Sequence, residues 1–267
     1  MSKIALAGLG WLGKPLAVHL QSLGHSIKGS TTSRDKQVLL TNAGIPTYNV
    51  LFTEDQVSGQ INNFLSEIEI LIVLIPPGLR KNSGHNHALK MLHFLNNVEE
   101  TQVSKVILVS STAVYDDEQG NVTEKDYPLP KANNGKQLLE VEELFQKSTA
   151  FKTTILRFGG LFGGSRNPVK HLAGRTELSN GEAPVNLIHR TDCIHIIEEI
   201  IKQDAFGYTF NAVSPQHPTK SAYYGKKAAE LGLKSPEYRK NQEDEIFKQI
   251  DSVNLKEILD YHFKVKI

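Results

Sequence analysis

Three glycines near the N-terminus constrain the fold more than any other feature of the sequence. Gly8, Gly10 and Gly13 form the segment GLGWLG, which follows the apolar run KIALA and opens an amphipathic run. In this order the glycines allow a tight turn, a close approach of the backbone to a pyrophosphate and close packing of a helix on a strand. The loop therefore predicts a dinucleotide site. Trp11 and Leu12 are expected to contact the cofactor there, and for Trp11 a packing role is an equal alternative.

Apolar runs alternate with amphipathic runs through the first 160 residues. Strands are expected over 3–8, 25–31, 68–77, 105–112 and 151–160, and helices over 12–24, 34–44, 87–98 and 135–147. Strands that are apolar on both faces and alternate with helices imply a parallel sheet covered on both sides. The sequence thus predicts an α/β fold with a Rossmann-type, doubly wound parallel sheet. Ile75 and Pro76, at the end of the run 68–77, are also predicted to contact the cofactor.

The pattern loosens after Gly164, where segments rich in Gly, Asn and Pro separate the later helices. We expect a smaller C-terminal substrate lobe that walls a cleft beside the sheet. The predicted division is a NAD(P)-binding Rossmann domain over residues 1–160 and the substrate lobe over 161–267, with segment 185–212 returning to the Rossmann domain.

The composition is that of an ordinary globular protein. A chain of 267 residues can bury a substantial core, and 39% hydrophobic with 22% charged residues is typical of this class. The net charge of +1 gives no reason to expect nucleic acid as a partner. The single Cys193 excludes an internal disulfide and a cysteine-rich zinc site, and it fits a reducing compartment. The apolar run at the N-terminus is too short for a membrane span, so we expect a cytoplasmic protein without a membrane partner.

The end of the second predicted strand bears on the choice between NAD and NADP. NAD-preferring proteins carry an acidic residue there for the ribose hydroxyls, whereas this chain has Thr31 near that position. Around it stand Ser30, Thr32 and Arg34, and hydroxyls with a guanidinium suit a 2′-phosphate. Asp35 argues against this, but it falls in the next helix turn, where an acid is an ordinary stabiliser. The sequence predicts NADP, with NAD as the alternative.

Three further segments carry a family resemblance. With SSTAVY at 110–115, LRFGGLFGG at 156–164 and NLIHRTD at 186–192, the chain resembles the extended and atypical short-chain dehydrogenase/reductases of the NAD-dependent epimerase/dehydratase type. Within this superfamily its sequence is most similar to the bacterial YeeZ-like proteins, a group classed with the oxidoreductases. The resemblance covers essentially the whole chain. It implies a Rossmann fold and a nicotinamide cofactor, and it says little about the substrate.

The resemblance also implies catalytic roles. In the family a Ser or Thr three residues before the Val of VYG binds the substrate oxygen, and that residue here is Ser111. The catalytic Tyr of the family falls at Ala132, and the Lys that activates it and holds the nicotinamide ribose falls at Lys136, so half of the dyad is missing. Tyr115 is the first substitute acid to consider and Tyr127 the second, although Tyr115 is also expected to pack beside the cleft. The alternative for Ser111 is that it only satisfies backbone groups at the strand end. The alternative for Lys136 is that it is an exposed helical lysine without a catalytic role.

Other polar clusters are better explained as structure. His85 and His87 do not share a helical face, and no carboxylate completes a set with them and His93, so they predict a solvated loop or helix start. Asp192 is expected to cap the helix that follows it, and Cys193 to lie in the core. No metal is therefore predicted.

These features predict a NAD(P)-binding oxidoreductase or epimerase-like enzyme that acts on a small polar or sugar-like molecule. Hydride transfer is chemistry of the cofactor, so the protein has to orient the substrate and provide a proton path. The alternative is a non-catalytic NADP-binding sensor, which the loss of the Tyr would permit. The expected partner is a small molecule, and a homodimer is the assembly left open.

Overall fold

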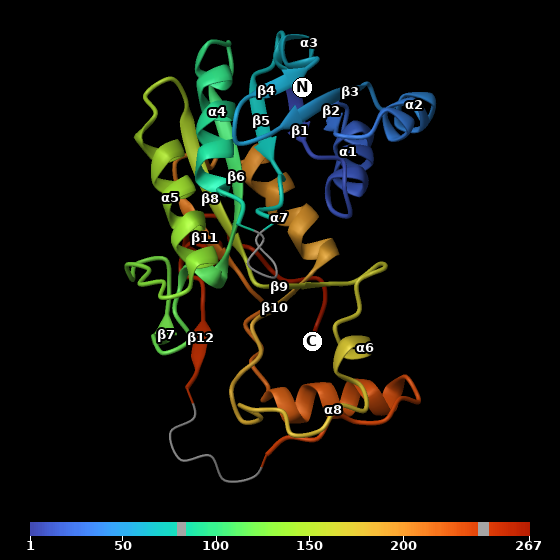
Figure 1. The fold of residues 1–267 in the computed structure, drawn as a ribbon, viewed down its shortest axis with the longest axis vertical. Coiled ribbons are helices and arrows are strands. Elements are labelled where there is room, and N and C mark those ends of the chain that lie inside the picture. The colour runs from blue at the N-terminus through green and yellow to red at the C-terminus, as the bar shows by residue number, and fades with distance from the viewer. Residues whose placement is uncertain (79–83, 240–245) are drawn as a thin grey trace.

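The computed structural model describes residues 1–78, 84–239 and 246–267. Its central element is an eight-stranded sheet with the strand order β11-β8-β6-β5-β1-β2-β3-β4 (Figure 1). The strands of this sheet are β1 (Lys3–Ala7), β2 (Ser26–Thr31), β3 (Thr47–Phe52), β4 (Val57–Gly59), β5 (Ile70–Val73), β6 (Lys105–Ser111), β8 (Lys152–Phe158) and β11 (Thr209–Ala212). Neighbouring strands are parallel except for β3 and β4, which pair antiparallel. The predicted doubly wound α/β fold is confirmed.

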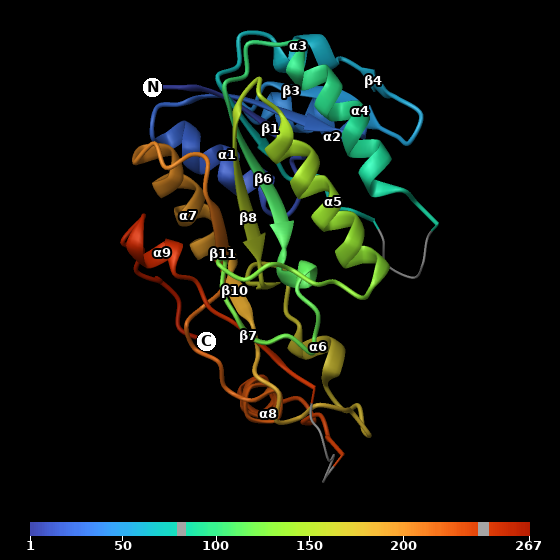
Figure 2. The same ribbon diagram turned by 90° about the vertical axis from the view of Figure 1, so that its left-hand side faces the viewer.

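Helices cover both faces of the sheet (Figures 1 and 2). One face carries α1 (Gly13–Ser22), α2 (Arg34–Asn42), α7 (Arg190–Lys202) and α9 (Asn254–Glu257), and the other carries α3 (Ile61–Leu65), α4 (His87–Glu99) and α5 (Asn133–Lys147). Each face of the sheet packs against its helices in a separate hydrophobic core. Because side chains alternate along a strand, Leu6 of β1 lies in the core beneath α1 and α7, while Ala5 lies in the core beneath α3, α4 and α5. None of the helices in the described part of the chain is both long enough and apolar enough to cross a membrane.

The structure adds β3, α3 and β4 between α2 and β5, a stretch for which the sequence pattern predicts no element. In β3 only Thr47 and Val50 are buried, so its apolar signal is too weak to stand out from a loop. β4 has three residues and pairs antiparallel at the edge of the sheet.

The segments that follow the carboxyl ends of β6 and β8 form a second layer of short elements below the sheet, here called the wall (Figures 1 and 2). The elements there are β7 (Gly120–Val122), β9 (Gly160–Phe162), α6 (Val169–Leu172), β10 (Leu187–His189), α8 (Lys220–Glu230) and β12 (Lys248–Ile250). β9 pairs with β10, and β7 pairs with β12, in two small parallel sheets. Between these stretches the chain returns to the large sheet as β11, next to β8, and α7 packs against α1.

Candidate functional site

The glycine loop joins β1 to α1 with the geometry of an anion site. Gly8 has a φ of +114°, a region that favours glycine, and its N–H donates to Ser30 Oγ at 3.1 Å. A Cβ on Gly13 would lie 2.0 Å from the carbonyl oxygen of Gly8, so the start of α1 packs directly on the turn. Apart from its two chain neighbours, no described residue has an atom within 4 Å of the Cβ position of Gly10. The loop is therefore tight on its inner side and open where a ligand would approach the N-terminus of α1.

The predicted cofactor residues after β5 lie next to the same loop. The carbonyl oxygen of Leu74 would be 3.2 Å from a Cβ on Gly8, and Ile75 and Pro76 follow it along the chain. Ile75 is half-buried and Pro76 is exposed. Leu12 has its side chain in the core, which leaves its backbone as the part that a cofactor could touch.

The residues at the end of β2 divide into a buried one and a more exposed group. Ser30 is fully buried, and its Oγ supports Gly8, so this hydroxyl belongs to the loop rather than to the open side. Thr31 is half-buried, whereas Thr32 and Arg34 are exposed. Within residues 1–78, 84–239 and 246–267 the Arg34 guanidinium has no hydrogen bond or ion pair.

Two arginines from distant parts of the chain lie over Trp11 of the glycine loop. The guanidinium carbon of Arg166 is 4.5 Å from the indole ring centroid, and that of Arg190 is 5.3 Å from it. Arg190 Nη1 also donates to the carbonyl oxygen of Trp11 at 3.5 Å. Trp11 Nε1 is buried, with no hydrogen-bond partner in the described part of the chain. The indole therefore packs against two guanidinium groups. These place two positive charges next to the glycine loop.

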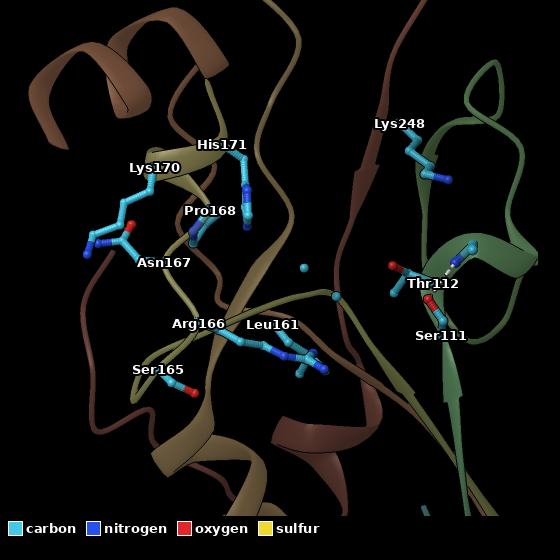
Figure 3. A pocket seen from close by; sticks show the side chains of 13 residues that line it. Ser111, Thr112, Leu161, Ser165, Arg166, Asn167, Pro168, Lys170, His171 and Lys248 are labelled. Atoms are coloured by element: carbon cyan, nitrogen blue, oxygen red, sulfur yellow. Dashed lines mark hydrogen bonds between the residues drawn. The ribbon is translucent and has the colours of Figure 1, made fainter. Parts of the chain in front are cut away.

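A cavity of about 670 Å³ opens at the carboxyl ends of β6 and β8 (Figure 3). Ser111 and Thr112 line one side of it, and residues of the segment 161–171 line the other. The cationic or potentially cationic side chains of the lining are Arg166, Lys170, His171 and Lys248. No Asp or Glu is found among the described lining residues. The cavity is therefore suited to a polar, anionic molecule.

The cations of the cavity have different surroundings. Lys248 Nζ donates to the carbonyl oxygen of Tyr115 at 2.6 Å and pairs with Asp117 at 2.9 Å, so its charge is partly compensated. His171, on α6, is exposed. Arg166 belongs to both features of the site, because it lines the cavity and lies over Trp11. The cavity and the glycine loop are thus adjacent.

Ser111 is fixed by the turn that follows it. It is the last residue of β6, and its Oγ accepts from the N–H of Ala113 at 3.2 Å. Gly135 of α5 packs on this turn, since a Cβ there would lie 2.4 Å from the carbonyl oxygen of Ala113. The first turn of α5 therefore lies beside Ser111.

Ala132 and Lys136 stand one turn apart at this end of α5. The N–H of Lys136 donates to the carbonyl oxygen of Ala132 at 3.1 Å, and both side chains are exposed. No hydrogen bond or ion pair holds the Lys136 ammonium in the part of the chain that the structure describes. The two residues keep the spacing of the family dyad without its phenol.

Neither tyrosine considered as a substitute acid is among the described residues that line the cavity. Tyr115 is 1% exposed, and its hydroxyl accepts from Arg157 Nη1 at 2.6 Å and donates to the carbonyl oxygen of Thr123 at 2.9 Å. Burial raises the pKa of Tyr115. Tyr127 is exposed and donates to Glu143 Oε1 at 3.2 Å, a contact that raises the pKa of Tyr127. The geometry gives Tyr115 a structural role, and it leaves Tyr127 exposed outside α5, in contact with Glu143 of that helix.

A buried ion pair lies beneath the end of β6. Arg157 Nη2 is 2.6 Å from Glu142 Oε2, and Ser110 Oγ donates to Glu142 Oε1 at 2.5 Å. Arg157 belongs to β8 and Glu142 to α5, so the ion pair connects these two elements. The hydrogen bond from Ser110 connects β6 to the same carboxylate. It therefore positions the strand end that carries Ser111.

The start of α7 corrects the prediction for Asp192. The helix is capped by His189, whose Nδ1 accepts from the N–H of Thr191 at 3.2 Å. Asp192 lies inside the first turn and is buried, with Oδ1 accepting from the Tyr261 hydroxyl at 2.8 Å. Cys193 is fully buried, and its predicted place in the core is confirmed.

The histidines near α4 are only partly as predicted. His85 is exposed and lies 3.0 Å from Glu54 through Nδ1. His87 is the first residue of α4, the predicted helix start, but it is 3% exposed, so the prediction that it is solvated is wrong. Burial lowers the pKa of His87 to about 3.

Comparison with known proteins gives full-length relatives named YeeZ. Over 266 residues the chain is 31% identical to protein YeeZ of Escherichia coli strain K12, and the match covers 99% of this chain and 96% of YeeZ. No protein-family model matches the chain.

Solved structures share the fold over nearly the whole chain. UDP-glucose 4-epimerase of Thermotoga maritima, solved with UDP-glucose, has a TM-score of 0.80 at 18% identity, with 99% of this chain and 94% of that chain covered. UDP-glucuronic acid 4-epimerase of Bacillus cereus in complex with NAD has a TM-score of 0.80 at 17% identity, with 99% and 92% covered. Because identities this low establish the fold alone, the family assignment depends on YeeZ. By its full-length similarity to YeeZ the chain belongs to the family of YeeZ-like proteins, and it has the fold of these UDP-sugar epimerases.

Proposed function

We propose that this protein is a NADP(H)-binding reductase or epimerase-like enzyme acting on a small, polar, sugar-like molecule that carries negative charge. The observation that carries the proposal is the position of Arg166, which lines the cavity on the side opposite Ser111 and also lies over Trp11 of the glycine loop. A substrate in the cavity and a dinucleotide at the loop would therefore be neighbours. The cationic lining supports an anionic substrate.

The glycine loop fits a dinucleotide, because Gly10 leaves the approach to α1 open and two arginines lie beside the loop. When bound, the nicotinamide supplies or accepts the hydride. In this proposal Thr31, Thr32 and Arg34 hold the adenosine 2′-phosphate, and the exposure of Arg34 supports that role. Similar solved structures contain NAD, so the preference for NADP depends on the residues of this chain alone.

The remaining roles concern the reacting oxygen. Ser111 would donate a hydrogen bond to it, and Lys136 would hold the nicotinamide ribose from the adjacent helix turn. Since position 132 is Ala, the proton has to come from another group. His171 lines the cavity, and imidazole is the side chain most often used for proton transfer near neutral pH. We therefore assign the proton path to His171 or to water beside it.

The second candidate function is a non-catalytic sensor of NADP(H). The exposed Ala132 and the absence of a tyrosine from the described lining favour it. In a sensor the cavity would bind a metabolite without turnover.

The test starts with calorimetric titration of the purified protein with NADPH and NADH. NADPH is then mixed with the protein and a panel of aldehydes, ketones and nucleotide sugars, and its oxidation is followed by absorbance. The enzyme proposal expects turnover with part of the panel and its loss in Ser111→Ala at unchanged NADPH affinity. Tight NADPH binding without turnover on any compound would favour the sensor. Failure to bind either dinucleotide would overturn both.

Three further assignments belong to this proposal. Residues 1–160 would bind the cofactor and 161–267 would supply the substrate wall, with 185–212 returning to the first part. The cytoplasm is the proposed location, to be checked by fractionation. A homodimer is the proposed assembly, to be checked by light scattering.

A further inference from the structure

Two histidines and a glutamate come together outside the cavity and the glycine loop. His19 lies on α1, and His195 and Glu198 lie on α7. His19 Nε2 is 2.7 Å from Glu198 Oε2, and His195 Nδ1 is 2.9 Å from the same oxygen. The three atoms all lie within 4.8 Å of one another. Figure 2 shows α1 and α7 side by side on one face of the sheet.

The helices that carry this cluster are fixed by the core beneath them. Leu16 and Leu20 of α1 lie in the same buried core as Ile197 of α7. His195 and Glu198 are three residues apart, so they share a face of α7. The spacing of the three side chains therefore depends on packed helices rather than on loops.

Exposure of the cluster allows an ion to reach it. The side chains of His19, His195 and Glu198 are 27%, 33% and 19% exposed. A cavity of about 360 Å³ lies next to them, lined by both histidines and by Pro15, Val18 and Ile194 among others. The two histidines are thus reachable from solvent through this cavity, and the Glu198 side chain is itself 19% exposed.

The donor atoms are those that transition metals prefer. Zinc sites hold imidazole nitrogen and carboxylate oxygen at about 2.0–2.2 Å, which places neighbouring ligand atoms about 3.3 Å apart. The two nitrogen–oxygen separations of 2.7 and 2.9 Å differ from this by about half an ångström, within reach of small side-chain rotations. We propose that His19, His195 and Glu198 bind one divalent transition-metal ion, with Zn²⁺ as the first ion to test.

Three protein ligands would leave one coordination position, which water can occupy from the adjacent cavity. Imidazole and carboxylate together also suit other first-row ions. An ion at this position would join α1, which begins at the glycine loop, to α7, which begins at Arg190. The proposed site therefore restrains two helices whose first turns contact the loop.

The test is calorimetric titration of the full-length, chelator-treated protein with ZnCl₂. One equivalent of Zn²⁺ is expected to bind, and His19→Ala, His195→Ala and Glu198→Gln are each expected to weaken it by about 10- to 100-fold. The matched control is His262→Ala, which removes an exposed histidine of the C-terminal segment and should leave the affinity unchanged. Circular dichroism checks that each variant is folded.

Thermal unfolding gives an independent measurement. Zn²⁺ should raise the melting temperature of the wild type and of His262→Ala, but not that of His195→Ala, because an ion that binds only the folded state stabilises it. Replacement by Co²⁺ should give visible absorption bands that disappear in His19→Ala. The proposal would be overturned if the wild type did not bind Zn²⁺. It would also be overturned if all three cluster variants bound Zn²⁺ with the affinity of the wild type.

Discussion

The guanidinium of Arg166 lies 4.5 Å from the indole centroid of Trp11, so a residue of the cavity wall contacts a residue of the glycine loop. A contact of this kind is worth about 0.5–1 kcal/mol where it is partly exposed. It keeps one positive charge at the boundary between the two parts of the site. A dinucleotide phosphate and an anionic substrate would both be attracted to it.

Gly10→Val should abolish dinucleotide binding and leave the protein folded. The Cβ position of Gly10 has no described neighbour within 4 Å, so valine fits the free protein and fills the approach to the loop. We expect NADPH to bind at least a hundredfold more weakly by calorimetry, about 2.7 kcal/mol. In the matched variant Gly13→Val, the new Cβ would collide with the carbonyl oxygen of Gly8 and should lower the unfolding midpoint. Unchanged affinity in Gly10→Val would exclude the loop as the site.

Arg34→Ala should weaken NADPH binding by about 10- to 100-fold, because a charge-assisted hydrogen bond to phosphate contributes about 1.5–3 kcal/mol. Affinity for NADH should not change, since NADH lacks the 2′-phosphate. Calorimetry on both cofactors measures the difference. Arg239→Ala removes an exposed arginine paired with Glu177 and serves as the control that should alter neither value. A wild type that binds both cofactors equally would contradict the predicted preference.

The adjacent serines of β6 should give opposite results. Ser111→Ala removes a hydroxyl from the cavity and should lower kcat by about 10²–10³-fold, with NADPH affinity unchanged. Ser110→Ala removes the donor to the buried Glu142 and should lower the free energy of unfolding by about 1–3 kcal/mol, with kcat nearly kept. Steady-state kinetics and urea unfolding separate the two effects. Wild-type turnover in Ser111→Ala would show that Ser111 does not act on the reacting oxygen.

Lys136→Ala should weaken cofactor binding by about tenfold, the effect of losing one charged hydrogen bond. Lys147→Ala, at the other end of α5, is the control and should bind normally. Ala132→Tyr restores a phenol one turn before Lys136 and should add carbonyl reductase activity by up to about 10²–10⁴-fold. Rates with small aldehydes measure this gain. NADPH affinity equal to wild type in Lys136→Ala would mean that the dyad has been placed at the wrong residues.

His87 should make the protein less stable in acid. Burial lowers its pKa from 6.5 to about 3, so between these values the unfolded chain holds a proton on this residue that the folded protein does not. The free energy of unfolding therefore falls as pH falls from 6.5 towards 3, by up to about 1.4 kcal/mol per pH unit. Urea unfolding from pH 7 to pH 4 should show a shallower loss in His87→Leu than in the wild type. The exposed His262→Leu should keep the wild-type slope, and identical slopes in all three proteins would exclude this role.

The sheet and its glycine loop could be predicted because their signals are local. The run KIALA is apolar on both faces, which is what a central strand with Leu6 in one core and Ala5 in the other requires. Gly8 and Gly13 are five residues apart, between the apolar run and the amphipathic run, so their spacing in this order indicates the loop.

The contacts that complete the site could not be predicted, because they form between segments far apart in the sequence. Arg166 stands in a stretch without periodic pattern and Arg190 at the start of α7, and only the folded chain brings them to Trp11. The cap of α7 is His189, three residues before Asp192, and a sequence pattern locates a helix boundary only to within about 2–4 residues, enough to exchange a cap for a first-turn acid. The burial of His87 does have a local signal, because this residue shares the buried face of α4 with Met91 and Phe94 at helical spacing.

The order of the elements limits how the wall of the cavity can evolve. The chain leaves the large sheet after β8 to form β9 and α6, returns as α7 and β11, and leaves again for α8 before β12 and α9 end it. A chain cut after Phe158 would lose an edge strand of the sheet and a helix that covers one of its faces together with the wall. The wall therefore cannot be exchanged as a unit between relatives. Changes in what the cavity binds would then arise by substitutions and by changes of loop length within the wall.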